Sequence, residues 1–436
     1  MSPVSLPFST HPQRDDLYNE LHARPFQVIT TPQQISHLAF KAQPHELDAA
    51  FIHLCELCRR YSVNPPPPDT GSYQQDFGGF ALRWERHMEF YALTFLRREQ
   101  AGPEPFRQPA IGLLPPDWLS ALPGEAIAAF HVVVDGGLLS IDTEDLTRYF
   151  EGHKLIISAP REGKAFFCTA FRLHSDGFGR FLVQNRGSSD QQTGRLIQRI
   201  IELETYRLLA QLSIPLAKRL STQLHDMDQM LANLLARVQS SDSAVDERAL
   251  LQNLSLLSTR LEAFRTETNY RFSATRAYHE LVHSRLRNIR ESKIEGHMTA
   301  AEFMTRRLNP GMRTCESVSN WMEDLSRRIE RAGDMLRTRV NLTLQEQNKG
   351  LLGAMNRRSR LQFRLQETVE GLSVVAITYY IVGLLGYLLN GLPLDFLGLE
   401  KPILLAALVP FVLAAAWGLT HRIKHRLIKE PTQQEE

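Results

Sequence analysis

Cysteine is scarce in this sequence, and the few cysteines present are scattered. Cys55, Cys58, Cys168 and Cys315 are the only four in 436 residues. Residues spread in this way cannot form the disulfide framework of a small secreted domain, so we expect a reducing compartment. The opening stretch, MSPVSLPFSTHPQRDDLYNE, lacks a basic segment followed by an apolar run. It therefore predicts no cleaved secretory signal.

An excess of charge of either sign is also missing. The sequence holds 50 Lys and Arg against 48 Asp and Glu, which gives a formal net charge of +2. That balance provides no overall attraction to nucleic acid, and we expect no nucleic-acid partner. The mean hydropathy of −0.25 is typical of a water-soluble protein. Any membrane-spanning part must therefore be a small fraction of the chain.

The N-terminal region, residues 1–192, mixes strand-like and helix-like patterns. Short runs rich in β-branched and aromatic residues, bounded by Gly, Pro or Asp, are typical of strands. These runs are FQVITT, HLAFKA, GFALRWERHMEFYALTFL, IAAFHVVVDG, KLIISA, AFFCTAFRL and FGRFLVQN. Between them, HELDAAFIHLCELCRRY has apolar residues at helical spacing, and NPPPPDTGSYQQD is a proline-rich loop. The pattern predicts a cytoplasmic α+β domain.

Residues 193–370 have few turn residues and predict long helices. Segments such as ALLQNLSLLSTRLEAF repeat apolar residues every three to four positions, with charged residues on the other face. We expect a helical, coiled-coil-like stalk without strands, interrupted at Pro215, near Gly296 and at Pro310. The last helix meets no further proline before Pro393, so we expect it to continue into the segment that follows.

Two charge-free runs follow the stalk, at about residues 371–392 and 402–420. Each is long enough to cross a hydrocarbon core of about 30 Å as a helix. They predict a transmembrane hairpin in a lipid bilayer, followed by a basic tail over residues 421–436. Buried core helices are the alternative, but two adjacent charge-free runs are rare in the soluble helices of a highly charged chain.

The charges around the hairpin predict its orientation. The basic segments MNRRSRLQFR and HRIKHRLIKE flank the two spans, whereas the connection NGLPLDFLGLEKP carries Asp395, Glu400 and one lysine. Because basic segments stay on the cytoplasmic side, we expect a multi-pass protein with both termini in the cytoplasm. Asp395 and Glu400 then lie outside, where they attract cations.

Small and polar residues recur at steps of three and four within the first predicted span. They are Ser373, Ala376, Tyr380, Gly383, Tyr387 and Asn390. This spacing places them on one face of a helix. The stripe is either a surface for close helix packing or the lining of a pore, and the sequence leaves both alternatives open.

Four stretches resemble those of a bacterial family of uncharacterised membrane-anchored proteins, known mainly from proteobacteria. They are LYNELHARPF, LRWERHMEFYALTF, YRFSATRAY and RLQETVEGLSVVAITYYIVGLLGYL. The resemblance covers nearly the whole chain and implies a place in the bacterial inner membrane, but no activity or catalytic residues. The order of an α+β domain, a long helix entering the first of two C-terminal spans and a basic tail is similar to that of CorA-type magnesium channels.

CorA-type channels carry a Gly-Met-Asn signature at the outer end of the first span, and this sequence lacks it. The corresponding stretch is GYLLNG, which ends in Asn390 and Gly391. In a symmetric oligomer, Asn390 can offer its carbonyl oxygen to a hydrated cation such as Mg²⁺. Alternatively, the two residues end the helix, because both tolerate the left-handed conformation of a C-cap.

The stretch HELVH, residues 279–283, has the spacing of a zinc-protease motif. His279 and His283 lie one helical turn apart, and Glu302 follows at a distance that some third zinc ligands have. In an antiparallel hairpin that turns near Gly296, however, Glu302 falls roughly 10 Å from the histidines along the axis. We therefore expect no metal site and place the histidines on a solvated stalk surface.

The stretch CELC, residues 55–58, has the spacing of a thioredoxin-type redox pair. Reactive cysteines of that type lie at a helix N-terminus, which lowers the thiol pKa, whereas these two fall toward the end of a predicted helix. We expect them to pack the helix. The sequence thus predicts no enzyme and no bound cofactor.

Two functions fit these features. The first, our leading hypothesis, is a CorA-like homo-oligomeric conduit for a divalent cation such as Mg²⁺, with the stripe around Tyr380 and Tyr387 facing a water-filled axis. The second is a membrane-anchored scaffold or regulator whose soluble domain binds an unknown protein partner. Two spans cannot enclose a pore alone, so a conduit requires several copies, and the stalk offers a surface for their assembly.

Overall fold

The computed structural model describes residues 8–14, 17–18, 27–68, 70–98, 103–240, 244–390 and 401–428. The chain divides into two compact units. The first comprises Met1–Ser241 and Arg248–Gly333, and the second comprises Asp242–Glu247 and Asp334–Glu436. The predicted division at residue 192 falls inside the first unit, because the helices that follow it pack on the sheet.

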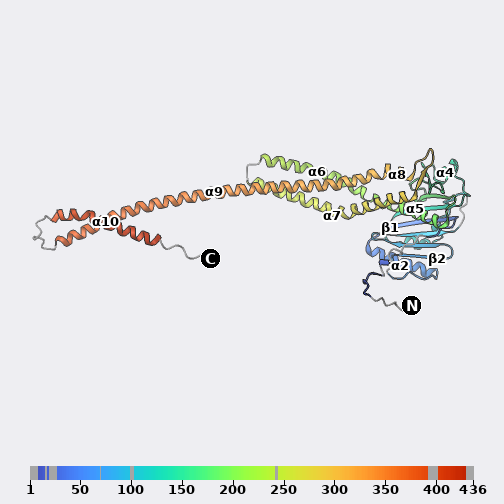
Figure 1. Ribbon diagram of the computed structural model, residues 1–436, viewed down its shortest axis with the longest axis horizontal. Coiled ribbons are helices and arrows are strands. Elements are labelled where there is room, and N and C mark those ends of the chain that lie inside the picture. Colours follow the sequence, from blue (N-terminus) through green and yellow to red (C-terminus); the bar gives the residue numbers. More distant parts are fainter. Residues whose placement is uncertain are drawn as a thin grey trace. The chain divides into compact units, whose positions relative to one another are not determined.

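Nine strands of the described residues form one sheet in the first unit (Figure 1). They are β1 (Gln33–Lys41), β2 (Ser72–Asp76), β3 (Ala81–Arg86), β4 (Phe90–Arg97), β5 (Glu125–Asp135), β6 (Ile156–Pro160), β7 (Ala165–Thr169), β8 (Gly179–Asn185) and β9 (Glu291–Lys293). The order across the sheet is β2-β3-β4-β1-β5-β8-β7-β6-β9. Neighbouring strands are antiparallel except β5 and β8, which are parallel.

Helices cover both faces of the sheet. The helices of the described residues are α2 (Pro44–Arg60), η1 (Ala110–Leu113), α3 (Pro116–Ser120), α4 (Thr143–Tyr149), α5 (Asp190–Gln211), α6 (Ser213–Ser240), α7 (Ala244–Ile289), α8 (Ala300–Arg307), α9 (Asn309–Asn390) and α10 (Lys401–Ile428). One face packs against α5, α8, the end of α7 and the start of α9. The other face packs against α2, α3 and α4. Because both faces are covered, the central strands are apolar at successive positions, as the predicted apolar runs indicate.

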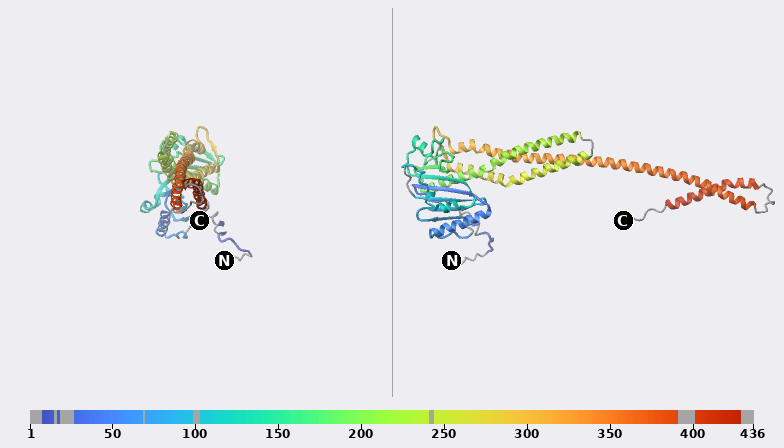
Figure 2. Two further views of the ribbon diagram at one scale, coloured as in Figure 1. Left: turned by 90° about the vertical axis from the view of Figure 1, so that its left-hand side faces the viewer. Right: turned by 180° about the vertical axis from the view of Figure 1, so that it is seen from behind.

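In the first unit, α6, α7 and the first part of α9 lie side by side (Figures 1 and 2). Arg219 of α6 pairs with Glu267 of α7, and Arg328 of α9 lies 2.6 Å from Asp228 of α6. The apolar positions at helical spacing form the buried surface between them. In α6 these are Ala217, Leu220, Leu224, Met227 and Leu231.

Three sequence-based expectations about strands are wrong. The described part of FQVITT, residues 27–31, forms no strand. β2 lies in the stretch predicted as a loop, because an edge strand that pairs on one side only can be polar. β9 is a strand after residue 200, where we expect none. Its sequence, ESK, has no apolar alternation to reveal it, yet it pairs with β6 at the other edge of the sheet.

The helices are interrupted close to the three predicted breaks. Only Leu212 separates α5 from α6, so Pro215 lies in the first turn of α6, where a missing N–H is tolerated. α7 ends before β9 and a turn at Gly296, whose φ is +79°. α8 and α9 are separated at Leu308, next to Pro310. A further break, between α6 and α7, carries no proline or glycine signal in the sequence.

In the second unit, α9 continues without interruption to its end and α10 packs beside its last turns (Figure 1). Val374 of α9 and Ala416 of α10 are buried, and a Cβ added at Gly386 would lie 3.5 Å from Leu405. The predicted continuity of the stalk helix with the first span is confirmed.

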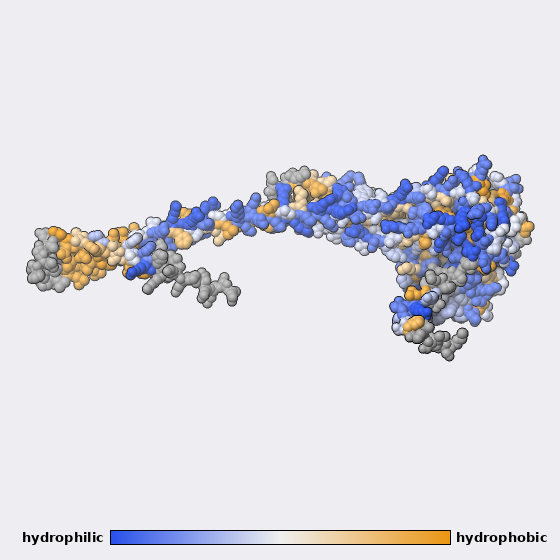
Figure 3. Space-filling model, in the orientation of Figure 1, coloured by the Kyte–Doolittle hydropathy of each residue, from blue (hydrophilic) through white to orange (hydrophobic). Residues whose placement is uncertain are grey.

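By length and composition, two helical stretches of the described residues qualify to cross a membrane. One is the most apolar part of Ala300–Leu389, and the other is Ile403–Ile423. The most apolar 18-residue segments of these two stretches have mean hydropathies of 2.0 and 2.2, respectively. Only 11% of the first segment and 6% of the second are buried. Neither is therefore a core helix, and apolar surface gathers on the hairpin (Figure 3).

Candidate functional site

The strands β5 and β8 are parallel neighbours, so the chain must cross over between them. This crossover, residues 136–178, contains α4, β6 and β7. On the sheet face that carries α2 and α4 lie two apolar clusters, one under each helix. Between them is a cavity of about 440 Å³. Its charged lining residues are Arg107, Arg148, Arg180, Glu104, Glu151 and Asp176.

Arg180, at the start of β8, connects the walls of this cavity. Its guanidinium donates hydrogen bonds to the carbonyl oxygen of Tyr149 at 2.8 Å and to carboxylate oxygens of Glu151 and Asp176, each at 2.9 Å. Cζ of Arg180 also lies 5.3 Å from the ring centre of Phe106. The side chain is only 10% exposed, so its charge needs both carboxylates beside it.

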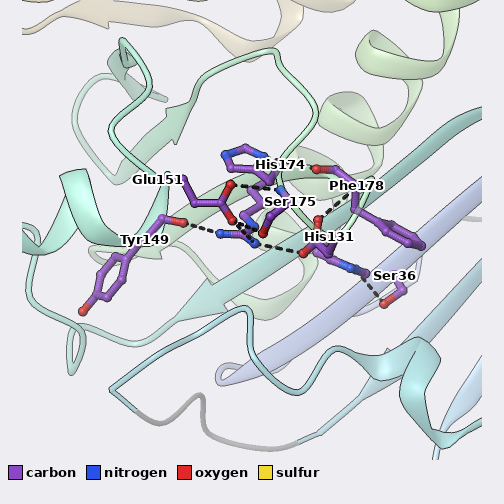
Figure 4. Close-up of polar contacts among 9 residues, drawn as sticks. Ser36, His131, Tyr149, Glu151, His174, Ser175 and Phe178 are labelled. Carbon is purple, nitrogen blue, oxygen red and sulfur yellow. Dashed lines mark hydrogen bonds and ion pairs between the residues drawn. The ribbon is translucent and has the colours of Figure 1, made fainter.

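The two carboxylates are held in their ionised form. Glu151 accepts hydrogen bonds from the backbone N–H of Ser175 at 2.9 Å and from its hydroxyl at 2.6 Å (Figure 4). These bonds, more than the nearby Arg180, keep the pKa of Glu151 below its usual value. Burial by itself would raise the pKa of Asp176. The backbone N–H of Phe178 and the Arg180 guanidinium outweigh it, so that pKa is also lowered.

His131 of β5 contributes a neutral imidazole to the cavity wall. Its ring stacks on Phe178 with centroids 4.3 Å apart, and its Nδ1 lies 3.0 Å from the hydroxyl of Ser36 (Figure 4). That hydroxyl also accepts the N–H of Ile111 and keeps a proton and a second lone pair, so it can pair with either tautomer of His131. Burial lowers the pKa of His131 to about 4. The ring is therefore uncharged at neutral pH.

A second buried histidine, His174, lies beside Phe178, which lines the cavity. Nδ1 of His174 donates to the carbonyl oxygen of Phe178 at 3.1 Å, which leaves Nε2 with a lone pair (Figure 4). Nε2 is buried and has no hydrogen-bond partner within the described ranges. Burial lowers the pKa of His174. The ring lies edge-on to His153, with centroids 5.2 Å apart.

These groups suit the binding of a small polar molecule. The cavity offers a neutral imidazole at His131, aromatic walls at Phe106 and Phe178, and the exposed guanidinium of Arg107. Sequence reasoning missed the site, because it used the stretch FGRFLVQN only as a strand signal. A turn precedes that strand, but the available signal was the pair Asp176 and Arg180, which lie four residues apart.

The stripe predicted in the first span lies on one exposed surface of α9. Ser373, Tyr380, Gly383 and Tyr387 are all exposed. α10 packs instead against another face of α9, which includes Val374. The structure therefore brings the stripe residues together, but the second helix of the hairpin does not cover them.

The residues predicted at the outer end of the hairpin are only partly described. α9 is described as far as Asn390, and the C-cap interpretation of Asn390 and Gly391 stays a prediction. Asp395 and Glu400 lie outside the described residues.

The histidines of HELVH contact Asn309 rather than Glu302. Nε2 of His279 lies 2.9 Å and Nε2 of His283 lies 3.3 Å from Oδ1 of Asn309, and the two Nε2 atoms are 3.0 Å apart. Glu302 instead caps α8 and pairs with Lys293 at 3.0 Å. The expectation of solvated histidines is wrong, because both are half-buried between α7 and α9. Burial, followed by the neighbouring His279, lowers the pKa of His283.

The cysteines of CELC lie in the packed part of α2. Cys55 is half-buried and Cys58 is fully buried. Burial raises the pKa of both thiols, and the Cys58 sulfur lies 3.5 Å from the hydroxyl of Tyr73. This environment favours the protonated thiol, which is a poor nucleophile.

A model of the family described as "Protein of unknown function (DUF3422)" matches residues 9–427. That range takes in the sheet, the cavity, the stalk helices and both apolar helices. The chain belongs to this family. The match does not support the similarity to CorA-type channels.

The DUF3422 family model extends from the sheet domain into α10, so the match includes residues of both units. The family model thus includes the apolar hairpin as well as the sheet domain. A search of curated proteins found no match.

Proposed function

We propose that the chain is a membrane-anchored scaffold or regulator that assembles into a homo-oligomer through one face of α9. In this proposal the hairpin holds the protein in the membrane, and the sheet domain binds a partner on the cytoplasmic side. The observation that carries the proposal is a row of exposed apolar and small side chains along one face of α9 in the second unit.

This face is defined by helical geometry. At about 100° per residue, a set of exposed α9 residues falls within an arc about 80° wide. The arc contains Leu344, Leu351, Met355, Leu365 and Val369 before the apolar segment, and Ser373, Ala376, Tyr380, Gly383 and Tyr387 within it. The buried residues Val374 and Thr378 lie on the opposite side of the helix, and Gly386, which contacts Leu405 of α10, lies about 100° from the centre of the arc.

A second copy of the chain fits this face along its whole length. Leu351, Met355 and Leu365 are each more than 60% exposed, and burying such a side chain stabilises by roughly 1.5–3 kcal/mol. A parallel copy in the same membrane presents the same residues at the same height. Apolar side chains then meet before the membrane, and small residues meet within it.

Polar residues interrupt the arc before the membrane. Arg358 and Gln362 fall near its centre on the same helical geometry. In coiled coils, single polar residues at core positions fix the register and the number of chains. The proposal therefore assigns these residues a role in specifying the oligomer.

The mass of the full-length protein in detergent tests the assembly. We expect a multiple of the 49.7 kDa chain, and a shift to the monomer when Leu351 and Met355 are both replaced by Arg. Glu346→Arg, on the opposite side of the helix, is the matched control and should keep the wild-type mass. A monomeric wild-type protein would contradict the proposal.

The topology proposed is that of a bacterial inner-membrane protein with both termini in the cytoplasm. It is supported by the basic segments at residues 355–364 and 421–430, which flank the two apolar helices. Reporter fusions at residues 1, 396 and 436 test it. We expect an external signal only at residue 396, and an external signal from either terminus would refute this orientation.

A divalent-cation conduit is the second candidate, favoured by the polar groups of the exposed stripe. In a symmetric oligomer Ser373, Tyr380 and Tyr387 of each chain would face a common axis. Asn390, at the end of α9, would then offer an oxygen to hydrated Mg²⁺ or a similar ion. This candidate requires the same oligomer as the scaffold.

Reconstitution into liposomes distinguishes the two candidates. A conduit predicts flux of Mg²⁺, Co²⁺ or Ni²⁺ above that of protein-free vesicles, and a lower flux in the Asn390→Ala variant. No flux from a verified oligomer would rule out the conduit and leave the scaffold.

A further inference from the structure

Three electron-donating atoms converge between α7 and α9. They are Nε2 of His279, Nε2 of His283 and Oδ1 of Asn309, separated pairwise by 3.0, 2.9 and 3.3 Å. The two histidines lie on one face of α7 because they are four residues apart. Asn309 is the first residue of α9. The break at Leu308 therefore places the side chain of Asn309 beside the two histidines.

Hydrogen bonding alone satisfies this arrangement poorly. A neutral imidazole carries one proton on its two nitrogens, and an amide oxygen carries none. If both Nε2 atoms were protonated, two N–H groups would face each other at 3.0 Å. If only one is protonated, its single proton is shared between two acceptors, the other Nε2 and Oδ1 of Asn309. A cation, by contrast, accepts lone pairs from all three atoms at once.

The separations also match one face of a metal coordination sphere. With metal–ligand bonds of about 2.1 Å, neighbouring ligands are about 3.0 Å apart in an octahedral site and about 3.4 Å apart in a tetrahedral one. Two of the observed separations, 2.9 and 3.0 Å, match the octahedral spacing, and the third, 3.3 Å, lies close to the tetrahedral one.

We propose that His279, His283 and Asn309 bind one divalent first-row transition metal ion, with water in the remaining positions. Two imidazoles and a neutral oxygen suit ions such as Co²⁺, Ni²⁺ and Zn²⁺ better than Mg²⁺ or Ca²⁺, which prefer oxygen ligands. The site is distinct from the zinc-protease arrangement, because Glu302 is bound elsewhere. It is also independent of the function proposed for the hairpin.

Solvent has access to these ligands. A cavity of about 270 Å³ is lined by His279 and Asn309 and also by Arg276, Arg313 and Glu316. The last three side chains are exposed, so water screens their charges from the site. The cavity provides both a route for the ion and room for water ligands.

Metal titration of the full-length protein tests the proposal. After removal of metals with a chelator, we expect one equivalent of Co²⁺ or Zn²⁺ per chain, with visible absorption from bound Co²⁺. His279→Ala and His283→Ala should each lower the affinity at least tenfold. His225→Ala, on α6 and bonded to Gln229, is the matched control and should bind as the wild type does.

A second variant decides the question if the alanine variants fail to fold. Asn309→Asp keeps an oxygen at the same place and adds a negative charge, so it should bind the ion more tightly than the wild type. The absence of saturable binding by the wild type would overturn the proposal. So would binding that His279→Ala leaves unchanged, or a folded Asn309→Asp variant with no gain in affinity.

Discussion

Gly194 of α5 lies directly against the backbone of Gln27. A Cβ on Gly194 would be 1.9 Å from the carbonyl oxygen of Gln27, which no side chain can tolerate. The N–H of Ile29 donates to the carbonyl oxygen of Asp190 at 3.3 Å, and the side chain of Ile29 is buried. The segment that begins at residue 27 is therefore held by α5 rather than by the sheet.

Replacing this glycine should destabilise the first unit. Gly194→Ala forces the two backbones apart, and we expect a loss of about 1–3 kcal/mol in the free energy of unfolding. Urea unfolding, followed through the buried Trp84 and Trp118, measures the change. The control is Gly333→Ala in α9, where nothing lies within 4 Å, and it should stabilise by up to about 1 kcal/mol. Equal stability of both variants would refute the close contact.

His131 should make the stability of the first unit depend on pH. Its pKa is about 4 in the folded protein and near 6.5 in the unfolded chain. Between these values the unfolded chain binds a proton that the folded protein does not, so the free energy of unfolding falls as the pH falls from 6.5 to 4. The slope from this residue is at most about 1.4 kcal/mol per pH unit.

The His131→Gln variant isolates that contribution. Unfolding in urea at several values between pH 7 and pH 4 should show a shallower loss of stability in the variant than in the wild type. His37, with a pKa lowered by burial to about 3, acts in the same direction and is present in both proteins. Parallel pH profiles would show that His131 titrates alike in the folded and unfolded states.

Arg180 should be essential to the cavity wall. Arg180→Met keeps the length of the side chain but leaves Glu151 and Asp176 without their cation. We expect a loss of about 2 kcal/mol, less than for a fully buried pair because both carboxylates are about one-third exposed. Arg172→Met, at a nearby exposed position, should change stability by less than about 0.5 kcal/mol. A similar stability for the two variants would count against the arrangement around Arg180.

The sequence predicts the elements whose patterns are regular. The apolar runs in β1, β4, β5, β7 and β8 and the spacing in α2 and α9 follow from burial, so periodicity reveals them. The sequence does not predict β9, because its three residues are polar and join the edge of the sheet only where the chain returns after α7. The segment at residues 27–31 misleads, because Ile29 is buried beside α5 instead of by strand neighbours, while Val28 is exposed.

The two sites depend on contacts between residues far apart in the chain. Arg180 meets Glu151 only because the crossover returns to β8, and His283 meets Asn309 only because the chain folds back through β9 and α8. No local sequence pattern predicts such a long-range contact. The spacing of HELVH brings His279 and His283 together, but it offers Glu302 as a third group, whereas the fold places Asn309 beside them.

Cysteine cross-linking in native membranes tests the central claim, assembly through one face of α9, most directly. In a Cys55→Ser background the three remaining native cysteines are buried. Leu351→Cys should form a disulfide-linked dimer on oxidation, because facing core positions of neighbouring helices come within the distance that a disulfide spans. Arg360→Cys, on the opposite side of α9, should remain monomeric. Equal cross-linking at both positions, or none at residue 351, would contradict the account.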